Sequence, residues 1–112
     1  ILDLSFNSLT SIPSGVRNAG KSLRELRLDG NYICILSPKA FEGLSNLKIL
    51  TLGSNQLHTL AEGAFHGLES LEKLSLWNNK LKRLSVGLFQ TLKSLRNLDL
   101  SDNKLQSLDK GT

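Results

Sequence analysis

A repeat of 24 residues is the feature that most constrains what this sequence can fold into. Leucine, asparagine and phenylalanine recur at this step along the chain, and the unit reads LxxLxLxxNxLxxLxxxxFxxLxx. With this many columns in one register, chance is not a serious explanation, and a fixed period of roughly 20–50 residues indicates stacked structural units. The units start near residues 1, 23, 47, 71 and 95, so the 112 residues hold about 4.7 repeats.

The leucine columns predict a short strand in every unit. In L-x-L the apolar side chains alternate with other residues, as a strand with one buried face requires. We expect strands at residues 1–4, 25–28, 49–52, 73–76 and 97–100. One unit cannot cover its own leucines, but stacked units can, because each unit covers the next. Successive strands then lie parallel, about 4.8 Å apart.

An asparagine stands just after each predicted strand. Where the chain leaves the strand, backbone groups turn inward and lose their ladder partners. A buried carboxamide offers two donors and an acceptor that can satisfy them. The alternative, surface asparagines in turns, does not demand the same step every time. We therefore predict a structural ladder made of Asn7, Asn31, Asn55, Asn79 and Asn103.

A phenylalanine column predicts a second apolar spine on the side opposite the strands. Phe41, Phe65 and Phe89 are 24 residues apart. Because aromatic rings are larger than leucine side chains, the back of each unit is wider, and the stack curves with its strands on the concave face. The first unit has no phenylalanine here, and Val16 stands one place early as a partial substitute. We expect the polar residues 17–22 to form an irregular loop on the convex side.

Composition excludes several classes of protein. Leucine supplies 26 of the 44 apolar residues, far more than in an average domain. No apolar run approaches the length of a transmembrane helix, so we expect no membrane contact from this segment. The single cysteine excludes an internal disulfide framework and a cysteine-cluster zinc site. We expect Cys34 to be a free, half-buried thiol, with pairing outside this segment as the alternative.

The side chains that point away from the leucines form columns on the concave face. These positions vary between units, so we expect a partner to contact them. The candidate ligand-binding residues are Arg27, Asp29, Lys73, Ser75, Trp77, Asp99 and Asp102. Trp77 is the most informative, because tryptophan is enriched at binding hot spots. The alternative is that it lies flat over Lys73 or Gly53 without a partner.

The histidines and the cysteine show no pattern typical of catalysis or metal binding. His58 and His66 are eight apart without metal-ligand spacing, and Cys34 has no clear histidine partner. We predict no enzyme activity, no cofactor and no metal. Basic residues concentrate in the fourth unit, at Lys80, Lys82, Arg83, Lys93 and Arg96. A solvated flank is the favoured interpretation. The alternative is a site for an anionic ligand such as glycan sulfate, lipid phosphate or nucleic acid, with affinity that falls with salt.

These columns resemble the leucine-rich repeat family over the whole chain. The 24-residue unit with a phenylalanine near its back is similar to the "typical" extracellular class, as in Toll-like receptor ectodomains and variable lymphocyte receptors. The resemblance implies an α/β solenoid, with short parallel strands on the concave face and loops or short helical turns on the convex face. The cysteine-rich caps of the family are absent. We expect residues 1–112 to be a single array from a longer chain.

The resemblance also implies a function. We expect a ligand- or protein-binding module of an extracellular receptor, used in innate or adaptive-like immune recognition, with a protein or glycan ligand on the concave face. The alternative function is that of a matrix or synaptic adhesion protein. Polyanion or nucleic-acid sensing is a weaker alternative, and a nucleic-acid partner is not favoured. Terminal repeats need polar caps, so we expect dimerisation through a flank or the ends. The apolar residues exposed there would be Leu2, Leu4, Leu100, Leu105 and Leu108.

Overall fold

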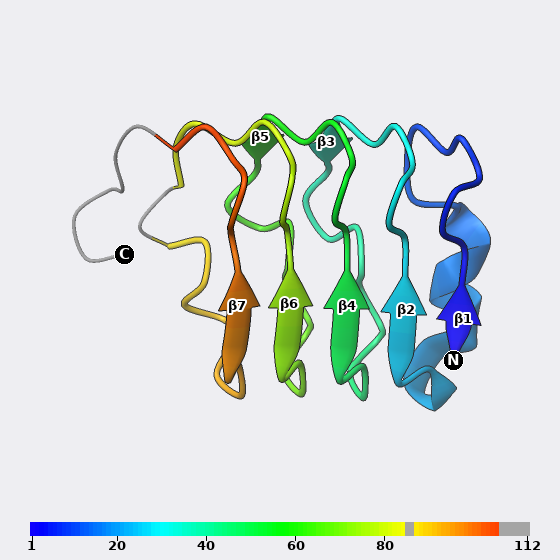
Figure 1. The fold of residues 1–112 in the computed structure, drawn as a ribbon. Coiled ribbons are helices and arrows are strands. Elements are labelled where there is room, and N and C mark those ends of the chain that lie inside the picture. The colour runs from blue at the N-terminus through cyan, green and yellow to red at the C-terminus, as the bar shows by residue number, and fades with distance from the viewer. Residues whose placement is uncertain (85–86, 106–112) are drawn as a thin grey trace.

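Short parallel strands, one for each repeat, stand side by side along the front of the molecule (Figure 1). The computed structural model describes residues 1–84 and 87–105. The strands pair in the order β1-β2-β4-β6-β7, and their bounds are β1 Leu2–Asp3, β2 Glu25–Arg27, β4 Ile49–Thr51, β6 Lys73–Ser75 and β7 Asn97–Asp99. Each leucine faces its counterpart 24 residues later, as Leu26 faces Leu50 and Leu50 faces Leu74. The predicted solenoid of parallel strands, with little helix, is confirmed.

The hydrogen-bonded ladder continues past the assigned strand ends. The Leu28 amide donates to the Thr51 carbonyl at 2.9 Å, and the Leu52 amide donates to the Ser75 carbonyl at 2.8 Å. Two residues later, the Gly30 amide donates to the Gly53 carbonyl at 2.9 Å. The coils are therefore joined by backbone hydrogen bonds up to the residue before each asparagine, although the assigned strands are up to three residues long.

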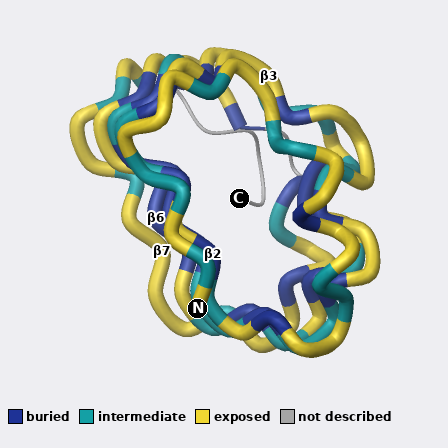
Figure 2. Tube along the Cα trace, turned by 90° about the vertical axis from the view of Figure 1, so that its right-hand side faces the viewer, coloured by how far each residue is buried: buried dark blue, intermediate teal, exposed yellow. Residues whose placement is uncertain are grey.

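The core consists of the leucines behind the strands and the phenylalanines at the back, and the coils superimpose when the stack is viewed along its length (Figure 2). The Phe41 and Phe65 rings stack with centroids 6.3 Å apart and planes 10° apart, and Phe65 and Phe89 stack at 6.4 Å and 14°. Because neighbouring strands are only about 4.8 Å apart, each coil is wider at its back. This difference bends the stack and makes the strand face concave.

A second, smaller sheet was not predicted. It lies in the part of the coil that follows the ladder asparagine. It pairs β3 Ile35–Leu36 with β5 Thr59–Leu60 in parallel, with Ile35 facing Thr59. Each of these strands has two residues, so it contributes one inward leucine and one outward residue. Such a short segment has no alternation that a sequence pattern can detect.

The first coil replaces the phenylalanine with a 3₁₀ helix. This helix, η1, spans Ser14–Ser22 and is interrupted at Gly20, where φ is 53°. The expectation of an irregular loop over residues 17–22 was therefore wrong. Val16 is 4% exposed and occupies the back of the coil, as predicted. Its amide donates to the Pro13 carbonyl at 3.1 Å, which begins the turn that brings the valine inward.

The asparagine column joins neighbouring coils from the inside. The Asn55 Nδ2 group donates to the Leu28 carbonyl at 2.9 Å and to the Leu52 carbonyl at 3.1 Å, and its Oδ1 accepts from the Ile33 amide at 3.1 Å. Asn31, Asn79 and Asn103 bond to both coils in the same manner. Asn7, in the first coil, is exposed. The ladder carboxamides thus replace the backbone partners that are lost at the turn.

The end coils are only partly covered. The expectation that their leucines face solvent was too strong, because one side of each still packs on the neighbouring coil. The half-buried leucines of the two ends include Leu2, Leu4, Leu100 and Leu105. Leu108 lies outside the described residues. Leu98 in β7 is 38% exposed, whereas Leu74, its partner in β6, is fully buried.

Within the part of the chain that the structure describes, no helix combines the length and the apolar character needed to cross a bilayer.

Candidate functional site

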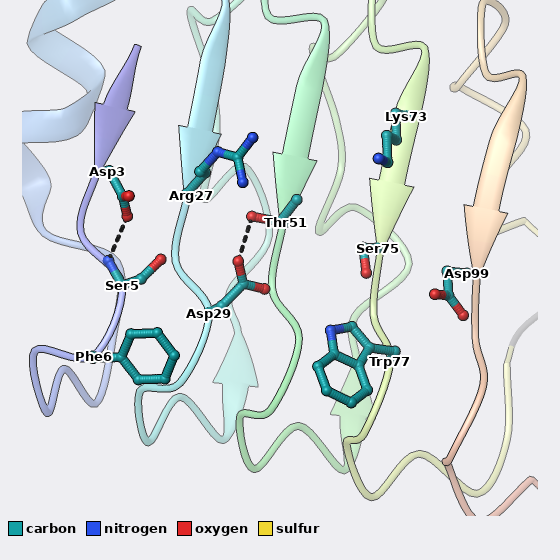
Figure 3. A pocket seen from close by; sticks show the side chains of 10 residues that line it. All are labelled: Asp3, Ser5, Phe6, Arg27, Asp29, Thr51, Lys73, Ser75, Trp77 and Asp99. Atoms are coloured by element: carbon teal, nitrogen blue, oxygen red, sulfur yellow. Dashed lines mark hydrogen bonds between the residues drawn. The ribbon is translucent and has the colours of Figure 1, made fainter.

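A depression of about 730 Å³ lies on the concave face and crosses all five strands of the larger sheet. Outward-pointing side chains from successive coils line it (Figure 3). The lining residues are Asp3, Ser5, Phe6, Arg27, Asp29, Thr51, Lys73, Ser75, Trp77 and Asp99. For every lining residue except Phe6, the strand parity that places leucines in the core places the side chain on the opposite face. The depression is therefore a direct product of the repeat.

Six of the seven candidate ligand-binding residues line this depression, and the seventh does not. The six are Arg27, Asp29, Lys73, Ser75, Trp77 and Asp99. Asp102 instead lines a separate groove with Lys80 and Lys104. It follows β7 with a left-handed backbone, at φ 57°, which places it at the rim of the concave face.

Two aromatic side chains mark the two sides of the depression, and each covers a glycine of a neighbouring coil. Trp77 lies over Gly53, where an added Cβ would come within 2.0 Å of the indole Nε1. Phe6 lies over Gly30, where an added Cβ would come within 2.3 Å of Cδ1. Trp77 is 40% exposed and Phe6 is 80% exposed. Figure 3 shows the two rings on either side of Asp29, so the depression has aromatic sides and a polar middle.

Sequence reasoning did not select Phe6. Its column, one residue before each asparagine, has a left-handed backbone in every coil, with φ of 59° at Phe6 and 54° at Ser54 and Asn78. This backbone turns the side chain away from the direction that simple strand alternation predicts. The available signal was the glycine at the same position of the next unit, Gly30, which leaves room for the ring.

The carboxylate of Asp29 holds the polar middle of the depression in place. Its Oδ2 accepts a hydrogen bond from the Thr51 hydroxyl at 2.8 Å, and its Oδ1 accepts from the Gly53 amide at 2.7 Å. Thr51 and Ser75 are each 8% exposed, so they form the floor. Asp29 therefore links β2 to β4 and contributes a fixed negative charge.

Asp3 and Asp99 occupy the same column in the first and last described coils. The Ser5 amide donates to Asp3 Oδ1 at 3.0 Å, and this bond lowers the pKa of the Asp3 carboxyl. The Ser101 hydroxyl donates to Asp99 Oδ1 at 2.6 Å and its amide donates at 3.0 Å, and these bonds lower the pKa of Asp99. Both carboxyls are ionised at neutral pH and place negative charge at the two ends of the depression.

The cations lie between these acids. Arg27 forms an ion pair with Glu25 on the same strand, and this contact raises the pKa of Arg27. Lys73 is exposed on β6, close enough to Asp99 to help lower its pKa. The depression thus has two cations and the Asp29 carboxylate in its middle coils, and an acid at each end. Such mixed charge suits a polar partner of matched pattern better than a polyanion.

Cys34 lies away from this depression. Its thiol is exposed rather than half-buried, which corrects the expectation from the sequence. Ile33 and Leu36 on either side point into the core, so the chain turns Cys34 outward, where its Sγ lies 3.5 Å from the Tyr32 carbonyl. Over residues 1–84 and 87–105, no cluster of three or more histidine, cysteine, aspartate or glutamate side chains could hold a metal ion.

The architecture defines a class of protein: a solenoid that presents variable residues on a concave face, which is a fold for protein interaction. A family model described as leucine rich repeat matches residues 1–45, 21–81 and 69–112, which together span the chain. The chain belongs to the leucine-rich repeat family.

Similar proteins include receptors and repeat domains. Over 48 residues, 43% of this chain, it is 46% identical to leucine-rich repeat-containing G-protein coupled receptor 5 of Xenopus tropicalis, but that segment is 5% of the receptor. Among solved structures, the leucine-rich repeat domain of APL1B superimposes with a TM-score of 0.88 over 97% of this chain and 33% of that one, at 31% identity. The LRIM1/APL1C complex gives the same TM-score over 97% of this chain and 20% of the other, at 33% identity. The chain therefore spans a third or less of each.

Proposed function

We propose that this chain is a segment of the ligand-binding ectodomain of an extracellular receptor of the immune-recognition kind, and that a protein partner docks on its concave face. Three observations support the proposal. The family is a protein-interaction fold, one of the similar proteins is named as a receptor, and the 24-residue unit with its phenylalanine resembles Toll-like and variable lymphocyte receptors.

The observation that carries the proposal is the pair of exposed aromatic rings beside a polar floor. Large aromatic side chains are enriched among the residues that dominate binding energy, and Trp77 and Phe6 retain 40% and 80% exposure. Burying the remainder against a partner contributes apolar area at low entropic cost, because each ring already rests on a glycine. Trp77 is fixed in place and still accessible, and both properties favour a binding role.

The charges of the depression define the partner's chemistry. Lys73 and Arg27 lie in its middle coils, and Asp3 and Asp99 lie at its ends. A complementary protein surface carries acidic groups opposite Lys73 and Arg27 and basic groups opposite the aspartates, Asp29 in the middle included. Apolar side chains of the same partner surface would contact the Trp77 and Phe6 rings. This pattern argues for a folded protein or a structured loop as the ligand.

The proposal is tested by screening the protein against a library of secreted and cell-surface ectodomains. Each binder is then measured against Trp77→Ala and Phe6→Ala, with Arg17→Ala on the convex helix η1 as the control. We expect the Trp77 change to lower affinity by about 2 kcal/mol or more, which is the size of a hot-spot effect. Binders that respond to Arg17→Ala and ignore both aromatic changes would contradict the proposal.

A second test uses Gly53 as a steric switch. Alanine at this position places its Cβ within 2.0 Å of the Trp77 indole, so the ring must swing away. The Trp77 side chain would then still be present, but it would no longer lie in its ordered position over Gly53. We expect Gly53→Ala to weaken binding about as much as Trp77→Ala. Unchanged binding would show that the position of the ring is irrelevant to recognition.

A further inference from the structure

Four exposed cations cluster on the flank that follows the asparagine column in the last two described coils. They are Lys80, Lys82, Arg83 and Lys104. Leu81 and Leu84 point into the core between them, so the intervening residues face outward. The Lys104 amide donates to the Leu81 carbonyl at 3.0 Å. This bond places Lys104 directly beside the segment that carries the other three, and we call the four residues the basic flank.

The charge of the basic flank is local and does not follow from the repeat. The equivalent positions in the first three coils carry Ser8, Thr10, Ser11, Tyr32, Cys34, Ile35, Gln56, His58 and Thr59. The two ion pairs between described residues, Arg27 with Glu25 and Lys48 with Glu72, both lie elsewhere. The stacking that positions these residues is the same in every coil, so scaffold requirements do not explain the cations.

A polar groove of about 450 Å³ opens beside the basic flank. It is lined by Ser54, Asn55, Gln56, Asn78, Asn79, Lys80, Asp102, Asn103 and Lys104. The ladder asparagines bond to backbone, whereas Asn78 reaches across the groove, and its Nδ2 donates to the Ser54 hydroxyl at 3.0 Å. Amides and hydroxyls of this kind match the hydroxyl groups of a sugar, and the lysines match anionic substituents on it.

We propose that the basic flank and this groove bind a sulfated glycan chain, at a site separate from the concave depression. A nucleic acid fits the site less well, because single strands are held largely by stacking on aromatic side chains and the groove lining contains none. The cations supply the attraction and the amides contact the sugar. Asp102 is the one carboxylate in the groove lining, and its charge opposes the ligand.

The test uses a heparin octasaccharide as the probe and compares two variants of equal charge. Lys80→Gln with Lys82→Gln removes two cations of the basic flank. Lys21→Gln with Lys93→Gln removes two exposed cations that lie outside it. We expect the flank variant to lose roughly tenfold or more in affinity at physiological salt and to lower the slope of log K against log salt by about two. The control variant should lose much less, and both should melt like the wild type.

A single change in the opposite direction sharpens the test. Asp102→Asn removes the opposing charge and keeps a residue that tolerates the left-handed backbone found there, at φ 57°. We expect it to tighten heparin binding severalfold. The proposal would be overturned if the two double variants lost the same affinity for heparin. A heparin affinity that does not change with salt, or weaker heparin binding by Asp102→Asn, would overturn it too. Tighter binding of a single-stranded oligonucleotide of the same charge than of heparin would overturn the assignment to a glycan.

Discussion

The middle coils and the end coils carry the same residues in the same columns, yet they differ in burial. Leu50 is fully buried and Leu98, in the same column, is 38% exposed. Asn55 is 3% exposed, whereas Asn7 lies in solvent. The local pattern is equivalent in each pair, so only the number of neighbouring coils differs. In a solenoid, the energetic contribution of a consensus residue therefore depends on the coils that cover it.

The largest effect should come from the leucine columns. Leu52→Ala leaves a cavity between two packed coils and should lower the free energy of unfolding by about 2–5 kcal/mol. Leu4→Ala, at a half-buried site of the first coil, should cost roughly 1 kcal/mol because less apolar area is lost. Denaturant unfolding with an unchanged m-value measures both. Equal losses would mean that the end coil is as well covered as the middle.

In the asparagine ladder, too, a substitution in a middle coil should lower the free energy of unfolding more than one in an end coil. The losses should be smaller than in the leucine columns. Asn55→Ala leaves backbone groups such as the Leu28 carbonyl and the Ile33 amide without their partner, which should cost about 1–3 kcal/mol. Asn7→Ala changes an exposed residue and should cost less than about 0.5 kcal/mol. The same unfolding measurement compares them. A large loss for Asn7→Ala would contradict the link between burial and stability.

The two aromatic residues of the concave face extend the comparison to the binding surface. Trp77→Ala should lower stability by about 1 kcal/mol, because more than half of the ring is covered. Phe6→Ala, at a residue that is 80% exposed, should stay within about 0.5 kcal/mol. A loss of several kcal/mol at Trp77 would make it a structural residue first.

Fluorescence provides an independent check of the Trp77 geometry. The protein has one tryptophan, so its emission reports on this ring alone. Gly53→Ala should move the emission to longer wavelength, because the displaced indole becomes more hydrated. The change Gly30→Ala displaces Phe6 instead and also strains a left-handed backbone, at φ 68°, but it should leave the emission of the folded protein unaltered.

The smallest effect should be a dependence on acid pH that arises at the two ends. The pKa values of Asp3 and Asp99 are lowered by their serine donors, so the folded state binds protons there less readily than the unfolded state. Their stabilisation is complete above the unfolded value of 3.8 and is lost as pH falls through the lower folded pKa. Replacing both with asparagine should flatten the stability profile below about pH 4. An unchanged profile in melting experiments would show that other carboxyls dominate.

Most of the fold could be predicted, because stacking imposes the same demand on each coil. The leucine columns predicted the parallel strands to within about a residue, and the phenylalanine column predicted the stacked rings at the back. The exceptions lie where the pattern lapses or is too short. The 3₁₀ helix Ser14–Ser22 replaces a missing phenylalanine, and the strands Ile35–Leu36 and Thr59–Leu60 are too short to show a period.

The candidate site was less predictable, because its contacts between coils join residues 22 or 24 apart that have no consensus role. Alternation placed Arg27 and Trp77 on the outer face, but it could not show that Trp77 rests on Gly53. It also could not show that Asp29 is held by the Thr51 hydroxyl. Phe6 was not among the candidates, although Asp102 from the same column was, because the pattern does not show that its ring lies over Gly30. That these residues bind a ligand stays a prediction, as does the single array within a longer chain.

The register of this protein is encoded in the spacing of its residues. A period of 24 decides which side chains share a column, since coils of unequal length could not keep leucine on leucine and asparagine beside the same carbonyls. How deeply each column member is buried, which side chains meet across coils, and where the unrepeated charges gather are set by the packing of the folded stack. Burial, contact and electrostatic field all depend on what the neighbouring coils place nearby, and that information is not contained in a single unit.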